Sequence, residues 1–93
     1  MTFEKKLTVL GQKIIVKGPS SVAYKKYDVY SSDDKKLFSF GDTRYQQFKD
    51  KLGYFSFKDH NDEKRRASYR KRHAKDNLDE LSPGYMSWHF LWS

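Results

Sequence analysis

The segment LTVLGQKIIVKGPSSVAYKKYDVYSSDDKKLFSF, residues 7–40, decides the fold, because short β-branched and aromatic runs alternate in it with turn-forming residues. Gly11 interrupts the first two runs, and Gly18-Pro19-Ser20-Ser21 and Ser31-Ser32-Asp33-Asp34 separate the later ones. In the last run, Phe38 and Phe40 are two residues apart, which places both side chains on one face of a strand. The segment predicts a small antiparallel meander.

The spacing of apolar residues changes to a helical period in the next segment. Asp42 is a good N-cap residue, and Tyr45, Phe48 and Leu52 follow at i, i+3 and i+7. Gly53 stands where a left-handed C-cap residue belongs. These features predict a short amphipathic helix over residues 42–53.

A second helix is predicted from a cap at Asp59 or Asp62 to Ala74, because acidic residues precede it and basic residues fill its last turns. It has a single large apolar side chain, so burial of its own stripe cannot hold it. We expect it either to be stabilised by a partner or to contact the domain through a few side chains. Those side chains are Tyr69, Ala67 and the stems of Arg66 and His73.

A third helix is predicted from Ser82-Pro83, which pairs an N-cap residue with a proline at the first helical position. The tail that follows is apolar nearly all round, and such a tail docks into a core or onto a neighbour. Trp88 and Trp92 lie one turn apart and can anchor either. We predict a protein interface at Trp88, Phe90 and Trp92.

The 93 residues fit a single α+β domain, with strands mainly in residues 1–41 and helices mainly in 42–93. Aromatic residues make up 17% of the chain against 37% hydrophobic residues in total, so the core depends heavily on rings. The chain lacks cysteine, which excludes disulfides and thiolate metal sites. It has no apolar stretch of the ~18 residues that a membrane span needs.

The net charge of +7 is local rather than diffuse. Residues 64–75 contain seven of the 19 basic residues and no acid, while the other basic residues are balanced by the 12 acidic ones. Such a concentration predicts contact with a polyanion, either nucleic acid or an acidic protein surface. The alternative is a solvated helix whose arginines pair with Asp59, Asp62, Asp76, Asp79 and Glu80. The candidate anion-binding residues are Lys64, Arg65, Arg66, Arg70, Lys71, Arg72 and Lys75.

The sequence offers no convincing catalytic constellation. Asp59-His60-Asn61-Asp62 together with His73 suggests a metal site, but a capping and hydrogen-bonding role fits this segment better. No glycine-rich phosphate loop or nucleophile elbow is present. We therefore predict no enzyme activity, no metal, no cofactor and no small-molecule substrate. Aromatic residues at 24, 27, 30 and 54–57 can stack on bases, although core packing is the default interpretation.

Several motifs together resemble one family of proteins. They are SFGDTRYQQFKDKLG at residues 39–53, DHND at 59–62, RRASY at 65–69, RH at 72–73 and SPGY at 82–85. The pattern spans residues 22–92 and resembles small basic proteins encoded by large double-stranded DNA viruses of algae, protists and related hosts. The resemblance implies a viral setting, without a known catalytic residue or cofactor.

The resemblance and the basic helix lead to two functional hypotheses. The first is a non-enzymatic structural component, a minor capsid or virion-internal protein that contacts an acidic surface of other virion proteins through its basic helix. The alternative is a small nucleic-acid-binding protein that coats or packages viral DNA. Both predict a location in the virion, and in the host cytoplasm or nucleus during assembly.

Overall fold

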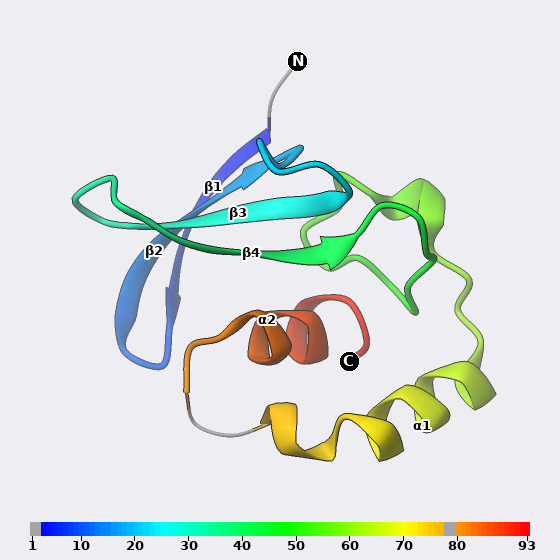
Figure 1. Cartoon of the computed structure of the whole chain (residues 1–93). Coiled ribbons are helices and arrows are strands. Elements are labelled where there is room, and N and C mark those ends of the chain that lie inside the picture. Colours follow the sequence, from blue (N-terminus) through cyan, green and yellow to red (C-terminus); the bar gives the residue numbers. More distant parts are fainter. Residues whose placement is uncertain (1–2, 78–79) are drawn as a thin grey trace.

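The computed structural model describes residues 3–77 and 80–93 of the chain. Four strands are followed by two α-helices and two short 3-10 helices (Figure 1). In chain order the elements are β1 (Phe3–Val9), β2 (Gln12–Gly18), β3 (Lys25–Ser31), β4 (Lys36–Asp42), η1 (Ser56–Lys58), α1 (Glu63–Arg72), η2 (Ala74–Asn77) and α2 (Pro83–Phe90).

The four strands form one antiparallel sheet in the order β1-β2-β3-β4, which confirms the predicted meander and the α+β class. The first hairpin pairs Val9 with Gln12 and leaves a two-residue loop. Both loop residues have positive φ, 53° at Leu10 and 75° at Gly11, as the twist-matched type I′ turn requires.

The core lies on the face of the sheet that α2 covers (Figure 1). Tyr27 is fully buried at its centre, stacked on Phe40 and edge-on to Phe55 at ring distances of 5.3 Å. Its hydroxyl donates a hydrogen bond to Asp50, so the polar end of this core ring is satisfied. The other buried apolar residues include Ile14, Val16 and Val29 from the sheet and Met86 and Leu91 from the C-terminal segment.

The predicted helix over residues 42–53 is wrong. After β4 the chain runs through turns, and its backbone groups bond to distant partners instead of to residues four positions away. The amides of Lys49 and Lys51 donate to the carbonyls of Leu91 and Phe90 at 3.0 and 2.9 Å. The Asp50 carboxylate accepts from the amides of Leu52 and Phe55 at 2.9 and 2.8 Å.

The cap predictions for the later helices are confirmed. The Asp62 carboxylate accepts from the first amides of α1, and Ser82 accepts from the Tyr85 amide at the start of α2. Pro83 occupies the first turn of α2. Helix α1 ends at Arg72, two residues before the predicted end at Ala74.

The apolar tail closes the core of this chain. Met86, Leu91 and Trp88 are 0%, 2% and 6% exposed. Trp88 therefore packs within the chain, whereas Phe90 and Trp92 are only partly buried, and their role as an interface stays a prediction. Within the described residues, no helix is long and apolar enough to cross a membrane.

Candidate nucleic-acid interface

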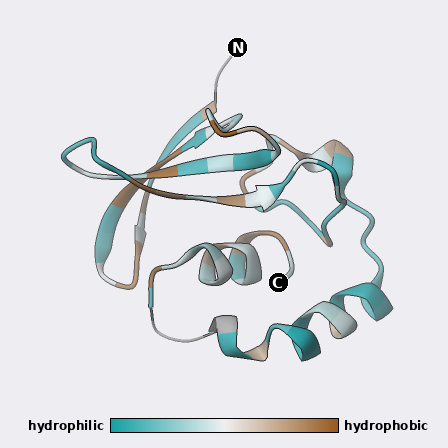
Figure 2. Cartoon of the chain, in the orientation of Figure 1, coloured by the Kyte–Doolittle hydropathy of each residue, from teal (hydrophilic) through white to brown (hydrophobic). Residues whose placement is uncertain are grey.

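Helix α1 stands off from the rest of the molecule. It is largely hydrophilic along its length (Figure 2), and none of its residues, all of them described, is buried. Stacking and cation–π contacts between side chains attach α1 to the domain. The ring of Tyr69 stacks parallel to that of Trp92, with ring centres 4.3 Å apart. The guanidinium of Arg66 lies 4.6 Å from the ring centre of Phe48, and that of Arg70 lies 4.7 Å from Trp88.

These contacts agree only in part with the predicted attachment of the helix. Tyr69 and Arg66 contact the domain as expected, and His73 stacks on Tyr69 at 4.3 Å. Ala67 is exposed, and Arg70 takes a packing role that was not predicted. Two of the seven candidate cations therefore serve in part to attach α1 to the domain.

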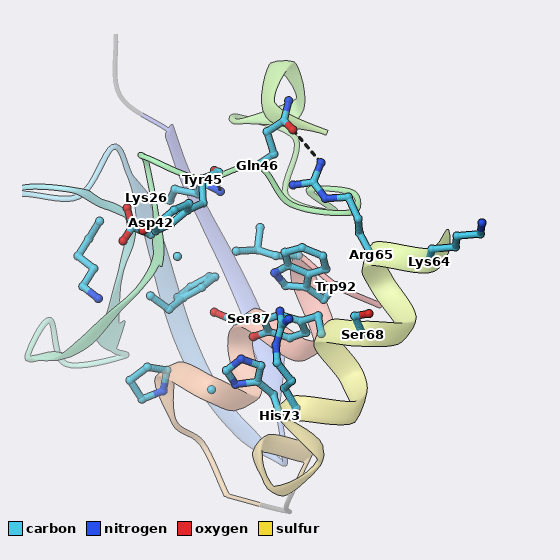
Figure 3. Close-up of a pocket in the computed structure, with 18 residues that line it drawn as sticks. Lys26, Asp42, Tyr45, Gln46, Lys64, Arg65, Ser68, His73, Ser87 and Trp92 are labelled. Atoms are coloured by element: carbon cyan, nitrogen blue, oxygen red, sulfur yellow. Dashed lines mark hydrogen bonds between the residues drawn. The ribbon is translucent and has the colours of Figure 1, made fainter. Parts of the chain in front are cut away.

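A groove of about 810 Å³ lies between α1, the start of β3, the end of β4 with the loop after it, and α2 with the C-terminal residues that follow it (Figure 3). Its basic lining residues are Lys25, Lys26, Lys64, Arg65 and Arg72. Among the described residues that line it, Asp42 is the single carboxylate. Its aromatic lining residues are Phe40, Tyr45, Tyr69 and Trp92. The groove therefore combines excess positive charge with ring surfaces.

The structure divides the remaining candidate cations of the 64–75 segment into two sets. Lys64, Arg65 and Arg72 line the groove, whereas Lys71 and Lys75 are exposed outside it. Arg65 reaches from α1 to the opposite wall, where it donates a hydrogen bond to Gln46 at 3.0 Å (Figure 3). Lys64 points away from the groove in the same view.

The acidic partners that the solvated-helix alternative assigns to the α1 arginines differ from the partner in the structure. Arg66 pairs with Glu63 at 2.6 Å, an i, i+3 contact that was not predicted. Asp62 instead caps the helix, and Asp59 accepts hydrogen bonds from Gln47 and the Asp50 amide. The predicted partner at position 79 and the side chain at position 76 lie outside the described part of the structure.

The negative charge of Asp42 is already paired. Arg44 donates hydrogen bonds to its carboxylate at 3.1 Å from Nε and 2.8 Å from a terminal nitrogen. These bonds hold the pKa of the Asp42 carboxyl at about 2, so it is ionised and neutralised locally at neutral pH. The repulsion that it would exert on an anion in the groove is therefore reduced.

Lys26 is a buried cation at the wall of the groove, 2% exposed. Its ammonium donates to the carbonyl of Tyr45 at 3.1 Å and to the side-chain oxygen of Gln47. Burial lowers its pKa from 10.5 to about 8, and the nearby Asp50 opposes this shift only in part. No sequence pattern indicates Lys25 and Lys26 as site residues, because they reach the groove from the sheet.

The shifted pKa of Lys26 predicts an unusual dependence of stability on pH. Between pH 8 and 10.5 the unfolded chain binds more protons at Lys26 than the folded one, so the free energy of unfolding should rise with pH there. Above its ordinary pKa of 10, Tyr27 reverses the trend, because burial and its bond to Asp50 raise its pKa and keep the folded form protonated. The rise should therefore appear between about pH 8 and pH 10.

Urea unfolding at pH 7.5, 8.5 and 9.5 measures this rise. The matched variant is Lys26→Met, which keeps the length of the stem and removes the titrating group. It should flatten the rise, whereas the general loss of net charge toward the pI of 9.6 affects both proteins. Equal pH profiles for the two proteins would show that Lys26 is not the group responsible.

His60 occupies the turn that precedes α1. Its Nδ1 accepts a hydrogen bond from the Asp62 amide at 2.9 Å, which agrees with the predicted hydrogen-bonding role. The ring lies 5.3 Å from Trp92, and its Nε2 has no hydrogen-bond partner among the described residues. Among the described residues, no three His, Asp or Glu side chains lie where they could together hold a metal ion.

The predicted aromatic candidates for base stacking fall into different environments. Tyr27 and Phe55 belong to the core, as the default interpretation held. Tyr24 and Phe57 are 61% and 72% exposed. Sequence reasoning did not single out Tyr45, which is 66% exposed, because its spacing suggested a buried helical position.

Comparison with protein-family models, curated proteins and solved structures finds no match for this chain. The resemblance to small basic viral proteins therefore stays a prediction.

Proposed function

We propose that this protein is a non-enzymatic nucleic-acid-binding component of a viral particle, and that its groove contacts the phosphates. The observation that carries the proposal is a groove lined by three exposed cations, Lys25, Arg65 and Arg72, with a single, internally paired carboxylate among its described lining residues. Lys26 adds positive charge from within the wall of the groove. Phosphate binding needs only charge density and reach, which these side chains supply. In this proposal the protein coats or packages viral DNA, and reaches the virion from the host cytoplasm or nucleus.

Aromatic side chains in the same groove favour nucleic acid over an acidic protein as the partner. Tyr45 supplies an exposed ring beside the cations, whereas the groove-lining rings of Tyr69 and Trp92 stack on each other. Interleaved rings and cations suit a ligand that has both phosphates and flat bases, whereas an acidic polypeptide uses mainly the charge. The groove therefore supports the nucleic-acid hypothesis better than the hypothesis of a purely protein-facing helix.

A second candidate function rests on a different surface. Lys71 and Lys75 are exposed outside the groove, and Phe90, which does not line it, is only partly buried. These residues suit a contact with an acidic surface on another virion protein, as in a minor capsid protein. This contact does not compete with use of the groove.

Fluorescence anisotropy with a labelled DNA oligonucleotide of about 20 nucleotides tests the proposal. Binding should be tight at about 50 mM NaCl and weaken steeply with salt, because each phosphate contact contributes about 0.7–0.9 to the slope of log K against log salt. We expect a slope of about 2–4, which corresponds to the groove cations. Absence of binding at low salt would remove the nucleic-acid proposal, and binding to an acidic peptide instead would favour the second candidate.

A further inference from the structure

Two exposed tyrosines lie near Arg44: Tyr45 lines the groove, and Tyr24 directly precedes the lining residue Lys25. Tyr24 and Tyr45 are 61% and 66% exposed, an unusual presentation for large aromatic residues in a small domain. The guanidinium of Arg44 contacts both rings, 4.7 Å from the ring centre of Tyr24 and 5.8 Å from that of Tyr45. We call these three residues the tyrosine rim.

The tyrosine rim is held in place by its surroundings rather than by burial. Arg44 is fixed by its side-chain bonds to Asp42 and by a bond from its own amide to the same carboxylate at 2.9 Å. The carbonyl of Tyr24, the residue before β3, accepts a hydrogen bond from the Thr43 amide at 2.9 Å. This bond joins the start of β3 to the loop after β4. Tyr24 adopts a left-handed backbone, with φ of 65°, that a bulky residue rarely takes.

The orientation of α1 argues against a duplex as the ligand. A recognition helix in a DNA major groove points its reading side chains away from the protein. Here Arg65 and Arg72 line a groove on the protein itself, while Arg66 and Arg70 cover aromatic rings of the domain. A ligand therefore contacts Arg65 and Arg72 at the groove that they line, while Arg66 and Arg70 are engaged with the domain.

A single strand can enter such a groove and has unstacked base faces to offer. A duplex hides those faces in its own stack, so exposed rings would add little to its binding. Because every base has an aromatic face, stacking on tyrosine is tolerant of sequence. The exposed tyrosine rings can therefore stack on the bases of one flexible strand, while the cations in the groove contact its phosphates.

We propose that the ligand is single-stranded nucleic acid, whose bases stack on the tyrosine rim while Arg65, Arg72 and Lys25 contact its phosphates. The inference rests on the proposed function, because it names the class of nucleic acid that the same groove binds. Tyr45 belongs to both the groove lining and the rim, so it is the residue that links base stacking to phosphate contact.

The experiment compares an oligothymidine single strand with a duplex of equal length, using the full chain and anisotropy at the same series of salt concentrations. The wild-type protein should bind the single strand about tenfold more tightly than the duplex. Tyr45→Ala should weaken single-strand binding by about five- to a hundredfold, the range for loss of one stacked base. Tyr45→Trp should retain it, and Tyr45→Ala should leave the salt dependence unchanged.

Phe57→Ala is the matched control, because Phe57 is 72% exposed and lies outside the groove. It should bind like the wild type, and circular dichroism checks that each variant is folded. Equal affinity for the two DNA forms, or a Tyr45→Ala variant that binds the single strand normally, would overturn the inference and leave the proposed function standing. Failure of both DNA forms to bind at low salt would overturn both.

Discussion

Removal of residues 83–93 should unfold the domain. The deletion takes away Met86, Trp88 and Leu91, which are at most 6% exposed, and Met86 and Leu91 belong to the hydrophobic core under the sheet. It also removes the carbonyls that accept hydrogen bonds from the amides of Lys49 and Lys51. The segment before α1 would then lose the apolar side chains of the tail and the two backbone hydrogen bonds that Lys49 and Lys51 make to it.

The expected loss exceeds the stability that such a domain has. Truncation of a single buried Leu or Met to Ala costs about 2–5 kcal/mol, and a Trp about 3–5 kcal/mol. A small domain has about 5–15 kcal/mol in total. Losing three buried side chains together with α2 should therefore leave no cooperative transition in urea, whereas Leu91→Ala should fold with a lower midpoint.

Circular dichroism and urea unfolding of the truncated chain measure this effect, with deletion of Ser93 alone as the control. A truncated chain that unfolds cooperatively, with native near-ultraviolet signals from its tyrosines, would contradict a core role for the tail. If that folded chain also failed to join a particle, the tail would be an interface with another subunit.

The sheet could be predicted because its signals are local. Each strand is a short β-branched or aromatic run, and each turn is marked by glycine, proline or a polar cluster next to it. The caps at Asp62 and Ser82 were predictable for the same reason, since a cap bonds to amides two or three residues away.

The segment 42–53 was mispredicted because its partners are remote in sequence. Phe48 and Leu52 are buried, as their spacing suggested, but a non-helical chain carries them. The deciding bonds join Lys49 to Leu91 and Asp50 to the Tyr27 hydroxyl. Tertiary contacts of this kind override local periodicity, and a single sequence does not reveal them.

The candidate site was predictable in its charge and not in its geometry. The density of Lys and Arg in residues 64–75 identified α1 as the candidate anion-binding element. The sequence predicted a contact of the Arg66 stem with the domain, but it indicated neither Phe48 as the partner nor the packing of Arg70 on Trp88. The groove is formed by the sheet, α1 and α2 together, so its contributions from Lys25 and Tyr45 depend on the fold.

The largest effect on binding should come from charge reversal inside the groove. Arg65→Glu with Arg72→Glu removes two groove cations and introduces two carboxylates there. Two lost phosphate contacts should weaken single-strand binding by about a hundredfold or more at about 50 mM salt. The slope of log K against log salt should decrease in magnitude by about 1.4, because each of the two lost phosphate contacts accounts for about 0.7 with a single strand.

The matched variant carries the same change of charge in residues 64–75, at positions that do not line the groove. Lys71→Glu with Lys75→Glu alters two exposed cations that lie outside the groove. Net charge and long-range attraction change equally in the two double variants, so a difference in affinity reports where the strand lies. Circular dichroism confirms that α1 is retained in both.

The affinity of these two double variants for a single-stranded oligonucleotide, measured side by side at one salt concentration, tests the central claim most directly. The account predicts a loss of about a hundredfold for Arg65→Glu with Arg72→Glu, and of less than about fivefold for Lys71→Glu with Lys75→Glu. Equal losses for the two variants, or a larger loss for Lys71→Glu with Lys75→Glu, would contradict a nucleic-acid site in the groove.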